Sequence, residues 1–242
     1  RSVWEIVKSA LEEDVQAIAV TSYQGGHVEF LQYMYDLLKE HNAASIKIFA
    51  GGGGTILPHE IKELEAYGIC KIYSPDDGRA MGLQGMINDL LSRSDYPVGN
   101  INNFDIEGIK KKNIRAIATA ISACENFKEL VKDDIATVQQ LTADDSTLVV
   151  GITGTGGSGK SSLIDELVLR FQQSNPDKTI AILSVDPTRQ KTGGALLGDR
   201  IRMNAIYHPN VYMRSLATRG SKTSVSNTIS DALHIMKLAG YD

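Results

Sequence analysis

Cysteine is scarce in this sequence of 242 residues: Cys70 and Cys124 are the only two. They lie far apart, Cys70 in an expected buried strand and Cys124 in an expected helix. This arrangement argues against a disulfide scaffold and against a cysteine-based zinc site. It fits a reducing compartment, and no secretory signal opens the sequence. We therefore expect a cytoplasmic protein.

Long apolar runs and an excess of positive charge are also missing. No apolar run approaches the roughly 18–20 residues that cross a bilayer. The 25 lysines and arginines are outnumbered by 29 acidic residues, which leaves a net charge of −4. The one basic cluster, Lys110–Lys112, is typical of a solvated helix face. We therefore expect neither a nucleic acid nor a membrane as a partner.

The first part of the chain alternates short apolar runs with amphipathic segments. The runs predict strands at 15–20, 46–50 and 69–73, and the segments between and around them predict helices at 3–14, 28–40, 58–68 and 79–93. Ser2 and Glu5 form a capping-box pattern, and Pro58 suits the first position of a helix. This order is typical of a parallel sheet covered by helices.

A polar stretch at 94–107 interrupts the pattern, and helices are expected over 108–141. A second alternating part follows, with strands at 147–152, 179–185 and 211–215 and helices at 160–173, 199–206 and 224–239. A long loop is expected between the second strand and its helix. The sequence thus predicts an α/β fold of two parallel-sheet modules, 1–95 and 144–242, joined by a helical linker over 96–143.

The segment Gly154–Ser161 matches the phosphate-binding pattern G-x-x-x-x-G-K-[ST] at every fixed position. An apolar run precedes it and an amphipathic segment follows, as this motif requires. Glycines let successive N–H groups face an anion, and the helix N-terminus adds positive charge. Lys160 would bridge the β- and γ-phosphates, Ser161 would ligate Mg²⁺, and Ser162 would contact the α-phosphate side. The backbone of the loop would contribute through Gly157, Ser158 and Gly159.

Two acidic residues near the next strand have two interpretations each. Asp186 ends a strand that delivers its last residues to the ligand edge, where it holds Mg²⁺ or only caps a turn. Asp199 is either a helix N-cap and nothing more, or a group that reaches the metal or the attacking water. In the second case Arg202, three residues further on, would neutralise phosphate charge.

These motifs carry a family resemblance. LVVGITGTGGSGKSSL and ILSVDPTRQKTGGALLGDRIRM closely resemble the MeaB-type G-protein chaperones of B₁₂-dependent acyl-CoA mutases, GTPases that guard cofactor loading and repair. The likeness runs on to about Gly240 and weakly back over NIRAIATAISACENF. It implies GTP as the nucleotide, Lys160 and Asp199 as catalytic residues, and Arg202 as a phosphate contact. The implied Mg²⁺ environment comprises Ser161, Val185, Asp186 and Asp199.

The same family continues beyond Asp242 into an acidic metal-site strand and an N-K-x-D motif that reads the base. Neither lies in this sequence. Guanine specificity is therefore implied by the resemblance alone.

Three loops of the first module follow strand ends, at 21–27, 51–55 and 74–78, where open α/β sheets bind ligands. They are either ordinary connections or a ligand edge. Gly53–Pro58 is similar to the G-G-x-x-x-P stretch of the B₁₂-binding domain of acyl-CoA mutases, while Val20–Tyr23 departs from that family's S-x-L by reading T-x-Y. The resemblance implies a site for the cobalamin tail at Thr21, Ser22, Tyr23, Gly53 and Gly54.

The cobalt-ligating motif of that family, D-x-H-x-x-G, would precede Arg1. His27 is not assigned this role, because its position predicts a helix N-terminus.

The B₁₂-domain resemblance comes first in the chain and the G-protein resemblance second. In this order the chain resembles the family of fused isobutyryl-CoA mutases, in which the G-protein lies between the B₁₂ domain and the substrate barrel. They imply a flavodoxin-like B₁₂-binding domain and a P-loop NTPase domain, both truncated, in a fragment of a homodimeric enzyme. That enzyme interconverts isobutyryl-CoA and n-butyryl-CoA with adenosylcobalamin and hydrolyses GTP with Mg²⁺. The acyl-CoA substrate would bind in a barrel outside this sequence.

Three alternatives remain open at this point. The first is a P-loop ATPase or small-molecule kinase with a regulatory α/β module. The second is a non-catalytic adaptor that binds nucleotide and a partner. The third is a separate G-protein that acts on methylmalonyl-CoA mutase.

Overall fold

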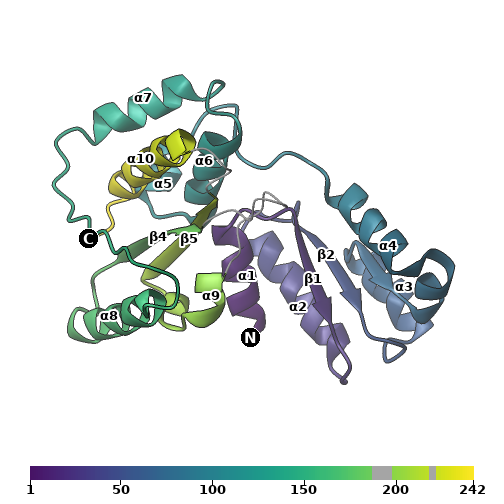
Figure 1. The fold of residues 1–242 in the computed structure, drawn as a ribbon. Coiled ribbons are helices and arrows are strands. Elements are labelled where there is room, and N and C mark those ends of the chain that lie inside the picture. Colours follow the sequence, from purple (N-terminus) through teal and green to yellow (C-terminus); the bar gives the residue numbers. More distant parts are fainter. Residues whose placement is uncertain (187–197, 218–221) are drawn as a thin grey trace. The chain divides into compact units, whose positions relative to one another are not determined.

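The computed structural model describes residues 1–186, 198–217 and 222–242, without the side chains of 186, 217 and 222–227. These residues form two compact units, Arg1–Val98 (unit 1) and Gly99–Asp242 (unit 2). Each unit combines parallel strands with helices, which confirms the predicted α/β class (Figure 1). The long loop expected before the helix at 199 falls largely on 187–197, outside the described residues.

Unit 1 holds a three-stranded parallel sheet in the order β1-β2-β3. In the register of the sheet, Thr21 lies beside Gly51 and Gly51 beside Tyr73, so all three strands end at one level. The segments that follow the three strands therefore start from the same edge. The first two are loops as predicted, but the loop predicted at 74–78 is wrong, because residues 75–78 are helical. The elements are α1 (Val3–Glu12), β1 (Ala17–Thr21), α2 (His27–Glu40), β2 (Lys47–Gly51), α3 (Pro58–Tyr67), β3 (Lys71–Tyr73) and α4 (Pro75–Ser94).

Local signals place several of these helix ends. The Ser2 hydroxyl accepts the Glu5 N–H at 3.2 Å while the Glu5 carboxylate accepts the Ser2 N–H at 2.9 Å, which confirms the capping box at α1. Pro58 begins α3 as expected. Helix α4 begins at Pro75, four residues before the expected start, because the Ser74 hydroxyl caps it by accepting the Asp77 N–H at 3.1 Å.

Unit 2 is built around the parallel pair β4 (Ile180–Asp186) and β5 (Val211–Ala217). Alternate residues of β4 face opposite helical layers. Ile180 and Ile182 pack in a cluster with Val168 and Met203, whereas Ala181 and Leu183 pack on the opposite cluster. The helices are α5 (Ile106–Lys110), α6 (Ile114–Asn126), α7 (Lys132–Leu141), α8 (Lys160–Ser174), α9 (Gly198–Arg202) and α10 (Lys222–Leu238), with a 3₁₀ turn η1 at Ala205–Tyr207.

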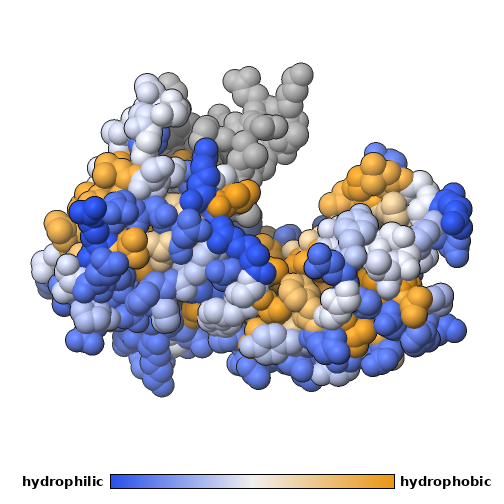
Figure 2. Space-filling model, turned by 90° about the horizontal axis from the view of Figure 1, so that it is seen from below, coloured by the Kyte–Doolittle hydropathy of each residue, from blue (hydrophilic) through white to orange (hydrophobic). Residues whose placement is uncertain are grey.

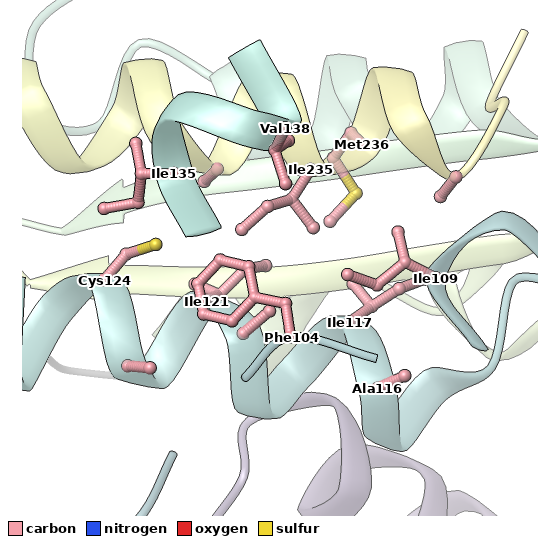
Figure 3. Close-up of a cluster of buried hydrophobic side chains, with 14 of the residues drawn as sticks. Phe104, Ile109, Ala116, Ile117, Ile121, Cys124, Ile135, Val138, Ile235 and Met236 are labelled. Atoms are coloured by element: carbon pink, nitrogen blue, oxygen red, sulfur yellow. The ribbon is translucent and has the colours of Figure 1, made fainter. Parts of the chain in front are cut away.

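The segment predicted as a helical linker supplies one layer of unit 2. Helices α5, α6 and α7 form over it, as expected, and their apolar faces pack against α10 (Figure 3). Ile117 and Ile121 of α6 are fully buried and lie in one cluster with Ile235 of α10 and Tyr212 of β5. This helical segment therefore covers the sheet of unit 2.

The strand predicted at 147–152 is wrong. In the described part of the chain this segment pairs with no strand, and Leu148 and Val150 are 78% and 70% exposed. A β-strand is stabilised by cross-strand hydrogen bonds and packing rather than by its own propensity. This apolar run therefore stays solvated and outside a sheet, where no described strand lies beside it.

Apolar side chains reach the surface on both units (Figure 2). In unit 1, Leu83, Ile87 and Leu91 are exposed at four-residue spacing, which places them on one face of α4. In unit 2, Leu163 and Leu167 are exposed in the same way on α8. No helix among the described residues has both the length and the hydrophobicity that a bilayer crossing requires.

The two cysteines differ in exposure, and this predicts different reactivity. Burial, reinforced by the nearby Asp231 charge, raises the pKa of the Cys124 thiol to about 12. At pH 8 about one Cys124 thiol in ten thousand is then the reactive thiolate. Native protein treated with iodoacetamide at pH 8 should carry the label on partly exposed Cys70 and not on Cys124, as read by peptide mass spectrometry.

Denaturation is the control, because it should make both thiols react. Native labelling of Cys124 as fast as that of Cys70 would contradict the packing of α6 against α10.

Candidate functional site

The glycine-rich loop of unit 2 curls into the N-terminus of α8. Gly157 and Gly159 have φ of +78° and +84°, values at which a side chain would be strained. Gly159 is the N-cap of α8, and the Ser158 N–H donates to the Thr155 carbonyl at 3.3 Å. The motif thus forms the turn that its glycines predict, although the strand expected before it is absent.

Lys160 lies across this loop. Its ammonium donates to the carbonyls of Gly154 and Thr155, each at 2.8 Å. The two carbonyls come from the opposite limb of the curl, so they hold the cation over the loop. Lys160 is therefore oriented by the loop itself.

Asp199 brings three elements together at the start of α8. Its carboxylate accepts the Ser161 hydroxyl from α8 and, at 2.8 Å, the Ser184 hydroxyl from β4. Burial disfavours the charged form of Asp199, but the two hydroxyls together with the nearby Arg202 and Lys160 charges outweigh it and keep the pKa of this carboxyl below its usual range. Asp199 is accordingly ionised at neutral pH, beside the serine that ends the motif.

Arg202 lies next to this carboxylate on α9. Its Nε donates to the Gly198 carbonyl at 3.1 Å, and a terminal nitrogen lies 3.7 Å from Asp199 Oδ1. The side chain is 71% exposed. It is therefore a solvated cation within reach of the same cluster.

Asp165 fixes the segment that follows α9. This residue lies one turn after Ser161 on α8, and its carboxylate accepts the backbone N–H groups of Asn204 and Ala205, each at 2.8 Å. These amides open the turn η1. The segment that carries Asp199 and Arg202 is thus tied to the helix that carries the phosphate motif.

For the other predicted site residues of unit 2, the structure gives a position on β4 or α8, and an exposure where the side chain is described. Val185 is 39% exposed on β4 beside Leu216, and Asp186 ends the strand beside Ala217. The Asp186 side chain is outside the description, so its role stays a prediction. Ser162 is exposed in the first turn of α8.

The donor set of this cluster suits a hard cation that arrives with phosphate. Among the described side chains, no three or more histidine, cysteine, aspartate or glutamate residues gather as a metal site. Oxygen atoms of Ser161, Ser184 and Asp199 do gather. Mg²⁺ prefers oxygen ligands and is commonly held by one or two carboxylates together with substrate phosphates. The residues present therefore fit Mg²⁺ bound with a nucleotide.

The structure also brings together the loop residues predicted in unit 1. Thr21 pairs with Gly51, and the Ser22 N–H donates to the Gly51 carbonyl at 2.9 Å. The Thr55 hydroxyl donates to the Ser22 carbonyl at 3.0 Å. The loops after β1 and β2 therefore form one hydrogen-bonded edge.

An aromatic ring lies against Gly53, one of the two glycines of this edge. Gly53 and Gly54 have φ of +55° and +100°, and a Cβ on Gly53 would lie 3.1 Å from the Tyr23 ring. Tyr23 is 70% exposed. The edge thus offers exposed backbone and an aromatic face, a combination that fits a large flat ligand.

His27 joins the first turns of α2 and α3 near the same edge. It is the first residue of α2, as expected, and its Nε2 lies 3.0 Å from the Glu60 carboxylate at the start of α3. The Leu57 N–H donates to that carboxylate at 2.7 Å. These two hydrogen bonds, the backbone one first, hold the pKa of Glu60 below its usual range.

Sequence reasoning missed Ser184 and Asp165. Ser184 stands two residues before Asp186, so strand alternation was the available signal for its face. Asp165 follows Ser161 by four residues, the spacing of one helix face. Their partners on α9 and η1 lie 15 to 40 residues away in sequence, and no local pattern marks them.

Relatives match the chain over its whole length or over its second half. Fused isobutyryl-CoA mutase from Geobacillus kaustophilus is 56% identical over 248 residues, and that from Cupriavidus metallidurans is 51% identical over 246 residues. Both matches cover all of this chain but only 23% and 22% of the relatives, so the chain spans less than a quarter of their length. Methylmalonic aciduria type A homolog, mitochondrial, from Caenorhabditis elegans is 33% identical over 140 residues, 52% of this chain and 35% of that protein.

The whole-length matches confirm the resemblance to fused isobutyryl-CoA mutases. A family model described as methylmalonyl-CoA mutase-associated GTPase MeaB matches residues 115–242. This range is more than half of the chain and contains the phosphate motif, Ser184, Asp199 and both strands of unit 2. The chain therefore belongs to the family of the mutase-associated GTPase MeaB.

Proposed function

We propose that unit 2 binds and hydrolyses GTP with Mg²⁺, as the chaperone part of an adenosylcobalamin-dependent isobutyryl-CoA mutase. One observation carries the proposal: Lys160 and Ser161 stand at the N-terminus of α8, and the Asp199 carboxylate contacts Ser161. Membership of the MeaB family supports GTP rather than another nucleotide. The identity to fused isobutyryl-CoA mutases supports the mutase context.

The loop and its lysine would hold the phosphates. The backbone of Gly157, Ser158 and Gly159 would contact the phosphates at the positive end of α8. Lys160 would exchange its two carbonyl partners for the β- and γ-phosphates, while Ser162 would contact the α-phosphate side. Because the ammonium is already held over the loop, little reorganisation is needed.

The remaining cluster would serve the metal and the developing charge. Mg²⁺ neutralises charge on the transferred phosphoryl group when it is bound. Ser161 and Asp199 would hold it, with Val185 and Asp186 at the end of β4 as further members of its surroundings. Asp199 would also orient the attacking water, and Arg202 would neutralise phosphate charge from its exposed position.

For unit 1 we propose that the edge formed by Thr21, Ser22, Tyr23, Gly53 and Gly54 contacts the tail of cobalamin. The hydrogen-bonded loops and the aromatic face support this role. When bound, adenosylcobalamin supplies the radical chemistry that interconverts isobutyryl-CoA and n-butyryl-CoA. The acyl-CoA would bind in a part of the relatives that this chain does not match.

Nucleotide preference tests the proposal for unit 2. In calorimetry on the full-length protein, a non-hydrolysable GTP analogue with Mg²⁺ should bind at least about tenfold more tightly than the ATP analogue, a difference of about 1.4 kcal/mol. Lys160→Ala should slow GTP hydrolysis by about 10²-fold or more, because a positioned cation at the phosphates is lost. Cobalamin binding should stay at the wild-type level.

Lys178→Ala is the matched control, since Lys178 is paired with Asp242 at the opposite end of β4. It should hydrolyse GTP at the wild-type rate. A preference for ATP would favour the ATPase or kinase alternative, and nucleotide binding without hydrolysis would favour the adaptor.

Tyr23→Ala tests the edge of unit 1. Removing an exposed aromatic face should weaken cobalamin binding about tenfold while moving the melting temperature without cofactor by less than about 2 °C. The affinity is measured by following the cobalamin absorption spectrum. Gly54 is a poorer target, because at φ +100° any side chain also strains the loop.

Tyr33→Ala provides the comparison, as Tyr33 is 53% exposed on α2 outside the two loops. Wild-type cobalamin affinity in Tyr23→Ala, or equal losses in both variants, would remove Tyr23 from the site.

A further inference from the structure

We propose that Ser184 is a positioning residue, which sets the Asp199 carboxylate for the Mg²⁺ of the bound nucleotide. This inference rests on the proposed nucleotide site. The two oxygens of Asp199 have different partners: Oδ1 contacts the Ser161 hydroxyl, and Oδ2 accepts the Ser184 hydroxyl at 2.8 Å. A carboxylate held through both oxygens has a fixed direction as well as a fixed place.

The anchor on the Ser184 side is rigid. Ser184 lies within β4, which pairs with β5 along its whole length, from Ile180 to Asp186. Alternation along the strand places Ser184 on the same face as Ile180 and Ile182, the face that packs toward α8. The hydroxyl therefore points from a hydrogen-bonded strand toward the helix that carries Ser161.

Asp199 itself stands on a short element that depends on such anchors. Helix α9 has five residues, fewer than an isolated helix needs to be stable. After α9, Asp165 holds the chain through the N–H groups of Asn204 and Ala205. Asp165 fixes where the segment runs, whereas Ser184 contacts the carboxylate directly.

The two hydroxyl partners of Asp199 differ in one respect: the Ser161 hydroxyl would also bind Mg²⁺, whereas the Ser184 hydroxyl would not. Ser161 is the residue proposed to ligate Mg²⁺, so its hydroxyl would no longer be reserved for Asp199 once the metal is bound. The Ser184 hydroxyl would then be the hydrogen-bond donor that keeps Asp199 oriented, since the exposed Arg202 lies farther away, 3.7 Å from Oδ1. Its removal should weaken the Mg²⁺-dependent part of nucleotide binding and leave the metal-free part intact.

The test is calorimetry on the full-length protein with a non-hydrolysable GTP analogue, in Mg²⁺ and in EDTA. Ser184→Ala should lower the affinity in Mg²⁺ about tenfold and leave the affinity in EDTA within about twofold of wild type; removal of a hydrogen bond to a charged group is of this order. Ser184→Thr keeps the hydroxyl and should restore most of the Mg²⁺ effect.

Two further variants make the result decisive. Ser174→Ala makes the same chemical change at the exposed end of α8 and should match wild type. Ser184→Cys keeps the side-chain volume but offers only a weak donor, so it replaces Ser184→Ala if that variant melts early. It should show the same selective loss.

The outcomes separate this inference from the proposed function. If the wild-type protein binds the analogue no better in Mg²⁺ than in EDTA, the proposed Mg²⁺ site fails. If wild type shows the Mg²⁺ effect and the Ser184 variants show it undiminished, or lose affinity equally in both conditions, Ser184 does not position Asp199.

Discussion

Parallel strand pairing is the constraint that places the loop edge of unit 1 and the β4 side of the candidate site in unit 2. Strands that run in one direction end at one edge, and every loop that follows a strand starts there. In unit 1 the pairing of Thr21, Gly51 and Tyr73 brings two loops within hydrogen-bonding distance. In unit 2 the pairing of β4 with β5 fixes the strand that presents Ser184 to Asp199. In each unit, backbone pairing places the strand ends, and side-chain hydrogen bonds then join the segments that follow.

In the proposed nucleotide site, the hydrogen bonds of Lys160 and Asp199 come from neutral partners. Lys160 is held by two carbonyls and Asp199 by two hydroxyls, with the exposed Arg202 as a more distant ionic partner of Asp199 at 3.7 Å, so Lys160 and Asp199 do not have to bind each other. A direct ion pair between them would have to be broken when phosphate and a metal enter, with a cost in desolvation and lost attraction. Neutral hydrogen-bond partners orient the same groups, and replacing them by phosphate or metal costs less free energy. This arrangement favours ligand exchange at a site that must bind and release nucleotide.

Local patterns in the sequence predicted most elements and the turn of the phosphate loop. Glycine at 157 and 159, Pro58 and the Ser2–Glu5 pair act within a few residues of themselves, so their effect can be read directly. Local patterns failed at 147–152, because a segment with high strand propensity forms a strand only when another strand lies beside it. Ser184 and Asp165 show a second limit, since their roles arise from contacts between distant elements.

The surroundings of each glycine loop decide which ligand chemistry it suits. Helix α8 has a glycine N-cap and no acidic residue in its first turn, so its positive end is open to an anion. Helix α3, which follows the glycines of unit 1, has its N-terminus occupied: the Glu60 carboxylate accepts the Leu57 N–H and stays charged through its lowered pKa. At the N-terminus of α4, Asp77 accepts the Ser74 N–H at 2.8 Å in the same way. A phosphate would meet a fixed negative charge at the N-termini of α3 and α4, whereas a bulky ligand that binds through an aromatic face and backbone groups would not need those helix ends. The positions of the acidic caps thus support the proposed division into a phosphate site in unit 2 and a site for a different ligand class in unit 1.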